Sequence, residues 1–309
     1  MTVLLLAPST ASELDSLAAA VERHDGEPRR VAIDNWPGAP MSLRADGSIE
    51  LGDPLGDVTG VYVHTPALFT MDAISLLNGV DLDENAWATL TQLREHRTTF
   101  ESLIGILADR GATVLPSPGA VRTNRRKPLQ LERFRAAGLP VPETLVTTEP
   151  ATAERFCERH GRVVYKPVAG GAPPAVVTPD DLDEERLAKL RAAPVQFQPF
   201  VPGDDLRVYV LDGQIVGGMR YESDRFSFKL DQAAGEDVSV SPLDVDDDLA
   251  ETARRAADAL DVRFGAVDLR RASDGSHTLL EVNQAPAFAG ADETAELGVA
   301  DALAELLVD

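Results

Sequence analysis

The first third of the chain alternates short apolar runs with amphipathic stretches, a pattern typical of a small parallel α/β domain. Apolar runs predict strands at 3–7, 31–34, 61–64 and 112–115, and helical spacing predicts helices at 12–23 and 84–110. Residues 44–48 form a turn signal, and Pro116–Gly119 ends the pattern with two prolines and a glycine. No Gly-x-Gly-x-x-Gly motif follows these strands, so a dinucleotide-binding fold is not indicated.

The remaining two thirds indicate two mixed α+β lobes. Helices are expected at 125–137, 180–192 (with Asp180 as N-cap), 246–260 and 300–307, and strands at 163–166 and 194–201. Two further strand pairs flank Asp212-Gly213 and Asp274-Gly275, which are strong hairpin signals. We therefore expect three domains, at 1–118, 119–195 and 196–309.

The second hairpin brings acidic residues together. With Asp274-Gly275 as a two-residue loop, Ser273 pairs with Ser276, and counting back places Asp268 opposite Glu281; a four-residue loop centred on the same point gives the same register. Asn283 lies two residues beyond Glu281 and shares its face. Carboxylates directly opposite each other repel, and a hard divalent cation with oxygen ligands would relieve the repulsion. The alternative is a solvent-facing acidic strand pair in a very acidic protein.

Charge and composition narrow the class of protein. The 309 residues carry a net charge of −22 and are 44% apolar, which indicates a globular protein and argues against a nucleic-acid partner. No apolar run reaches the roughly 20 residues that span a bilayer, so we expect a cytoplasmic protein without a membrane partner. The single cysteine, Cys157, is expected to be a packed thiol. Dispersed acidic residues and scarce lysine suggest a halophile-like, salt-adapted protein.

The few lysines stand at informative places. There are only four, and two of them, Lys127 and Lys166, occupy a helix start and the end of a strand before the small-residue loop 169–174. Such a loop can bring backbone N–H groups close to phosphates. An apolar strand then runs through 194–202 into Asp205, where backbone groups could bind a flat base and the acid a ribose hydroxyl. Each lysine alone could equally be a solvated surface charge.

In this order, these segments resemble an ATP-grasp ligase, and most closely the RimK-like branch of ribosomal-protein glutamate ligases and peptide-modifying ligases. The resemblance covers about residues 112–290 and rests on Asn124…Lys127, the 138–144 connector, Val164–Pro167, Gln198–Arg207, and Asp268…Glu281-x-Asn283. It implies an α/β (α+β) fold in which an N-terminal parallel pre-ATP-grasp domain precedes two lobes that clamp ATP.

The resemblance also implies roles for individual residues. Phosphates would be held by Lys127 and Lys166, and one or two Mg²⁺ ions, with Mn²⁺ as an alternative, by Asp268, Glu281 and Asn283. The predicted nucleotide-binding set is completed by Gln198, Pro199, Phe200, Val201 and Asp205. The residues expected near the reacting carboxylate and the transferred phosphoryl group are Arg207, Arg225 and Lys229.

The implied activity is ATP-dependent joining of a carboxylate to an amine through an acyl phosphate, with an amino acid or a peptide as substrate. Two alternatives stay open: a small-molecule kinase with the same ATP site, and a catalytically inactive nucleotide-binding protein, because Pro173-Pro174 stiffens the loop expected to cover the phosphates. His64, at a strand end, is either a substrate-facing group or a hydrogen-bonded loop histidine. Substrate identity and oligomeric state are open, a homo-oligomer being one option.

Overall fold

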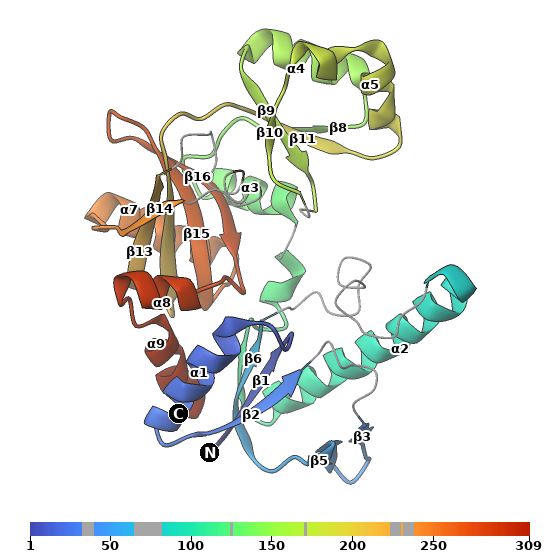
Figure 1. Cartoon of the computed structure of the whole chain (residues 1–309), viewed down its shortest axis with the longest axis vertical. Coiled ribbons are helices and arrows are strands. Elements are labelled where there is room, and N and C mark those ends of the chain that lie inside the picture. Colours follow the sequence, from blue (N-terminus) through green and yellow to red (C-terminus); the bar gives the residue numbers. More distant parts are fainter. Residues whose placement is uncertain (33–39, 65–81, 124–125, 170–171, 223–229, 231–237) are drawn as a thin grey trace. The chain divides into compact units, whose positions relative to one another are not determined.

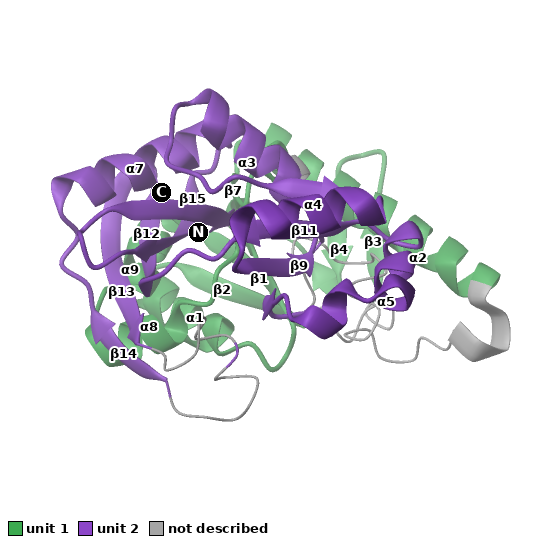
Figure 2. Cartoon of the chain, turned by 90° about the horizontal axis from the view of Figure 1, so that it is seen from above, with its two compact units in different colours: residues 1–121, 284–309 green, residues 122–283 purple. Residues whose placement is uncertain are grey.

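The computed structural model describes residues 1–32, 40–64, 82–123, 126–169, 172–222, 230 and 238–309. Within these ranges the chain divides into two compact units, coloured separately in Figure 2. Unit 1 comprises Met1–Val121 with Gln284–Asp309, and unit 2 comprises Arg122–Asn283. The expected cuts at 118 and 195 therefore differ from this two-unit division, which returns the C-terminal segment to the N-terminal unit.

Unit 1 is built on a parallel four-stranded sheet with the order β2-β1-β6-β7. The strands are β1 (Thr2–Ala7), β2 (Glu27–Ala32), β6 (Val58–Val63) and β7 (Thr113–Leu115). The apolar run 3–7 is fully buried, as expected for a parallel strand that is covered on both faces. The predicted parallel α/β domain is confirmed.

Unit 1 also contains helices and a small antiparallel sheet (Figure 1). The helices are α1 (Ser12–Arg23), α2 (Leu82–Asp109), α8 (Ala289–Ala295) and α9 (Val299–Val308), and the antiparallel strands are β3 (Met41–Leu43), β4 (Ile49–Leu51) and β5 (Asp53–Pro54). Helix α9 packs on α1 and β6. It approaches so closely that a Cβ on Gly60 would lie 2.3 Å from the Leu307 carbonyl oxygen, so only glycine fits there. This packing explains why the C-terminus belongs to unit 1.

Unit 2 contains a small antiparallel sheet with the order β10-β9-β11-β8. Its strands are β8 (Leu145–Thr147), β9 (Val163–Pro167), β10 (Ala175–Val176) and β11 (Val195–Pro199). Helices α4 (Pro150–His160) and α5 (Glu184–Ala188) bury one face of this sheet in a core that includes Phe156, Cys157, Leu187 and Phe197. Burial raises the pKa of the Cys157 thiol, which agrees with the expected packed, unreactive cysteine.

The predicted helix at 180–192 is wrong, because the segment divides into three short pieces. These are η4 (Pro179–Leu182), α5 (Glu184–Ala188) and η5 (Lys189–Arg191). The Asp181 carboxylate accepts from the Thr178 N–H (3.0 Å) and hydroxyl (2.8 Å), and Asp183 leaves the helical conformation to accept from the Glu185 N–H. A segment this rich in acids offers several competing caps, and Asp180 is not the one used.

The second sheet of unit 2 has five antiparallel strands in the order β14-β13-β12-β15-β16. They are β12 (Asp204–Leu211), β13 (Gln214–Glu222), β14 (Ser239–Pro242), β15 (Phe264–Arg271) and β16 (His277–Asn283). Helices α3 (Lys127–Ala136) and α7 (Asp247–Ala259) pack on it, and η3 (Ala120–Thr123) precedes α3. In the part of the chain that the structure describes, no helix has the length and apolarity needed to cross a membrane.

Candidate functional site

The hairpin of β15 and β16 places Asp268 opposite Glu281, as the sequence predicts. The path to this register differs from the expected one. Arg271 pairs with His277, and the Gly275 N–H bonds to the Ala272 carbonyl, so the loop is longer than two residues. A bulge between Asp268 and Leu269 then moves the register by one residue and restores the pairing.

Arg207 joins this pair from the neighbouring strand. It stands directly opposite Asp268 in the β12–β15 ladder, and its guanidinium donates to Asp268 through Nε to Oδ1 (2.8 Å) and Nη2 to Oδ2 (3.1 Å). The Asn283 amide also donates to Asp268 Oδ2, at 2.9 Å. Burial alone would lower the pKa of Arg207, but the adjacent Asp268 carboxylate raises it above its ordinary value. The guanidinium is therefore a fixed positive charge.

Lys127 brings a second cation to the site from the first turn of α3. Its ammonium forms an ion pair with Glu281, and both side chains are largely buried. Gln130, one turn further along α3, ties the helix to β16. Its Nε2 donates to the carbonyls of Thr123 (3.0 Å) and Val282 (3.2 Å), and its Oε1 accepts from the Val282 N–H (3.1 Å). The sequence motif contains Gln130, but we predicted no role for it. Gln130 thus fixes α3 to the backbone next to Glu281, and this contact is visible only in the three-dimensional structure.

The charges of this cluster balance within the protein. Asp268 is paired with Arg207 and Glu281 with Lys127, so the repulsion from which we predicted a cation is already relieved by two basic side chains. Among the described residues no group of three or more His, Cys, Asp or Glu side chains has a metal-binding arrangement. The cluster instead offers two carboxylates and one amide oxygen, a donor set that fits Mg²⁺, which commonly takes one or two carboxylates and completes its shell with phosphate and water.

Two tyrosines complete the surroundings of Arg207. Tyr209 follows it by two residues on β12, and Tyr221 lies on the adjacent strand β13. Burial raises the pKa of both phenols, while the positive charge of Arg207 opposes that rise. Both therefore stay neutral hydroxyls at physiological pH. We did not predict them, although Tyr209 shares the strand face of Arg207 by simple alternation.

The expected nucleotide-binding residues divide between the two sheets of unit 2. Lys166 on β9 lies opposite Gln196 on β11. Gln198, two residues further along β11, is buried and donates from Nε2 to the Thr144 hydroxyl at 2.8 Å.

The strip that follows β11 is anchored by arginines. The Phe200 N–H donates to the Arg162 carbonyl (2.8 Å), and the Arg162 guanidinium lies 3.7 Å from the Phe200 ring centroid. The N–H of Phe200 is thus occupied within the protein. Asp205 is buried, and its Oδ1 lies 3.5 Å from Nη1 of Arg270.

The structure does not bring the remaining predicted site residues together. Arg225 and Lys229 lie outside the described residues, whereas Pro199 ends β11 and Val201 follows it, half-buried. His64 belongs to unit 1, where its Nδ1 lies 3.2 Å from the Tyr62 hydroxyl and its Nε2 lies 3.7 Å from the buried Glu13 carboxylate. These contacts agree with the hydrogen-bonded alternative for His64.

With this geometry in place, comparison with known proteins identifies the class. The chain belongs to the RimK-like ATP-grasp family, whose domain model matches residues 124–307. The resemblance stated from the sequence is therefore confirmed, and so is the ATP-grasp fold with its parallel N-terminal sheet.

Individual relatives are similar over different lengths. The solved structure of the ATP-grasp ligase PsnB, complexed with a minimal precursor, is 28% identical with a TM-score of 0.83, covering 99% of this chain and 98% of that one. The macrocyclase MdnC from Microcystis aeruginosa, bound with precursor peptide MdnA, shares the fold at 23% identity and a TM-score of 0.82, with 100% of both chains covered. Tetrahydromethanopterin:alpha-L-glutamate ligase from Methanocaldococcus jannaschii is 26% identical, over 55% of this chain and 61% of that protein. The chain thus spans less than two thirds of the length of the curated relatives that it matches first.

Proposed function

We propose that the chain is an ATP-dependent ligase that joins a carboxylate to an amine with release of ADP and phosphate. The observation that carries the proposal is the convergence of Arg207, Asp268, Asn283, Glu281 and Lys127 on one region of the five-stranded sheet. Phosphoryl transfer to a carboxylate needs positioned charges more than covalent chemistry from the protein. Family membership and relatives named as ligases support the same reaction class.

Each charged residue has a role in this proposal. Asp268, Glu281 and Asn283 would hold Mg²⁺, which supplies a positive charge that neutralises phosphate oxygens. Lys127 and Lys166 would bind phosphates, and Gln198, Pro199, Phe200, Val201 and Asp205 the nucleoside. The Arg207 guanidinium is oriented by two bonds to Asp268, so it can stabilise negative charge on the substrate without first being ordered. Arg225 and Lys229 would supply further positive charge.

A peptide is the substrate class that we favour. The support is that the ATP-grasp ligase PsnB, solved in complex with precursor peptide PsnA2 and AMPPNP, is 28% identical to this chain and covers 99% of it. We also propose a cytoplasmic enzyme, and its net charge of −22 argues against a nucleic-acid partner.

An ADP-release assay across panels of amino acids and peptides, with mass spectrometry of the products, tests the proposal. An amide product that is lighter than its parts by one water supports it. A stable phosphorylated product would instead identify a kinase. ATP binding without turnover on any substrate, in a protein that melts cooperatively, would identify a non-catalytic nucleotide-binding protein.

A further inference from the structure

Gln196 is a buried glutamine whose amide makes no hydrogen bond to the residues that the structure describes. It is the second residue of β11 and is 0% exposed, and within the described ranges neither its Nε2 nor its Oε1 has a hydrogen-bond partner. Leaving a buried amide unsatisfied is destabilising, and a leucine of similar size would avoid that cost. The presence of a glutamine at this position is therefore explained best by a ligand that forms hydrogen bonds with its amide.

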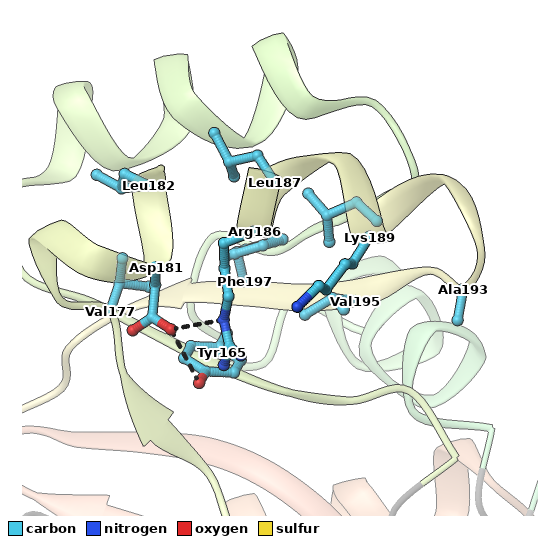
Figure 3. A pocket seen from close by; sticks show the side chains of 11 residues that line it. Tyr165, Val177, Asp181, Leu182, Arg186, Leu187, Lys189, Ala193, Val195 and Phe197 are labelled. Atoms are coloured by element: carbon cyan, nitrogen blue, oxygen red, sulfur yellow. Dashed lines mark hydrogen bonds and ion pairs between the residues drawn. The ribbon is translucent and has the colours of Figure 1, made fainter. Parts of the chain in front are cut away.

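The two faces of the small sheet show on which side this amide lies. Val195 and Phe197 line an apolar cavity of about 210 Å³ beneath α5, together with Tyr165 of β9 (Figure 3). Because side chains alternate along a strand, Gln196 points away from this cavity. It shares the opposite face with Lys166, its direct cross-strand neighbour, and with Gln198. These are two of the residues that we propose to bind ATP.

The chemistry of the amide selects one part of ATP. Phosphate oxygens only accept hydrogen bonds and would leave Oε1 unsatisfied. The adenine edge offers an N6 donor next to the N7 acceptor, which an amide of glutamine can bind with both of its polar atoms. Gln198 is less suited to this role, because its Nε2 already donates to Thr144.

We propose that the Gln196 amide reads the N6/N7 edge of adenine and so makes the site selective for ATP. The inference rests on the proposed function, because it assumes that Lys166 and its neighbours face the nucleotide. It adds a specificity residue that neither the motif nor the predicted nucleotide-binding set contains.

The experiment compares wild-type protein with Gln196→Leu in two measurements. In the first, calorimetry gives dissociation constants for Mg·ATP, for 7-deaza-ATP, which lacks N7, and for purine riboside triphosphate, which lacks the N6 amino group. Wild-type protein should bind each analogue about 10-fold more weakly than ATP, a loss typical of one hydrogen bond. Gln196→Leu should bind ATP about 10- to 100-fold more weakly, and the three nucleotides within about 2-fold of one another.

The second measurement is the melting temperature of the nucleotide-free protein. Gln196→Leu should melt higher, because the unsatisfied amide is removed, so stability and ATP affinity should change in opposite directions. The matched control Gln214→Leu removes an exposed glutamine from the Asp212-Gly213 hairpin and should alter neither quantity.

Two results would overturn the inference. One is retained discrimination against the analogues in Gln196→Leu, whether or not all three nucleotides bind more weakly, and the other is a fall in melting temperature that reveals a structural role for the amide. If wild-type protein binds no ATP at all, the proposed function fails as well. If Gln196→Leu binds ATP as wild-type protein does and discriminates equally against the analogues, only the role of Gln196 is wrong.

Discussion

The buried ion pair between Arg207 and Asp268 gives a quantitative prediction. The two side chains are only 12% and 10% exposed, and two hydrogen bonds join them. Removing one partner leaves an uncompensated charge in the interior, which typically costs about 3–5 kcal/mol. Asp268→Asn and Arg207→Met should each lower the stability of unit 2 by about that amount. For a unit of this size, the loss corresponds to a fall in melting temperature of roughly 6–20 °C.

Removing both charges together should cost much less than the sum of the single losses. Replacing a buried pair by neutral side chains is often close to neutral, so we expect a coupling energy of at least about 2 kcal/mol. Urea unfolding of wild-type protein, both single variants and the double variant measures this coupling directly.

The chain contains a matched control for this cycle. Arg263 and Asp212 form an equally well-aligned pair, with two bonds of 2.7 Å, but both side chains are 40% exposed. The coupling in the cycle of Arg263→Met and Asp212→Asn should be only about 0.2–1 kcal/mol, because water screens the charges. If the Arg207–Asp268 coupling is as small as that of the exposed pair, the two charges do not form the rigid unit on which our account of the site depends.

Four further predictions follow from the same structure. Gln130→Leu should destabilise unit 2 by about 2 kcal/mol in urea unfolding, because it leaves the Val282 backbone unsatisfied; unchanged stability would contradict the clamping role. Lys127→Met should weaken ATP binding at least about 10-fold in calorimetry, the loss expected for one charge-assisted contact. An unchanged dissociation constant would show that Lys127 does not bind ATP. Burial lowers the pKa of His64, and the charge of Glu13 opposes this shift. Stability should therefore fall as the pH drops below about 6.5, where the histidine takes up a proton in the unfolded chain but not in the folded one. The fall in melting temperature should be smaller in His64→Gln. The melting temperature should rise toward molar salt if the acidic composition reflects salt adaptation, and a flat titration would reject that hypothesis.

The register of the β15–β16 hairpin shows how far sequence reasoning reaches. Strand alternation and one turn signal predicted Asp268 opposite Glu281, and the structure confirms this pairing, although a bulge is needed to offset the longer loop. The pairing of the residues between the turn and Asp268 could not be predicted. A longer loop and a compensating bulge depend on local twist and packing, which no residue pattern near Asp274-Gly275 reveals.

Other features could not be predicted because they depend on long-range packing. The unsatisfied amide of Gln196 is visible only once its burial and its neighbours are known. The role of Gln130 requires α3 to lie beside β16, about 150 residues further along the chain. The charge balance of the site differs from the sequence argument for the same reason, because the Lys127–Glu281 pair joins segments that are distant in sequence.

The most direct test of the account is magnesium-dependent ATP binding by the double variant Asp268→Asn with Glu281→Gln. Both substitutions keep the size of the side chain and remove the charges proposed to hold Mg²⁺. Isothermal calorimetry with and without Mg²⁺ should show that magnesium strengthens ATP binding at least about 100-fold in wild-type protein. The double variant should lose this enhancement. It should melt at a lower temperature than wild-type protein, because Arg207 and Lys127 lose their partners, so binding is measured at a temperature where its cooperative unfolding has not begun. If magnesium strengthens ATP binding equally in both proteins, the metal site lies elsewhere and the central claim is wrong.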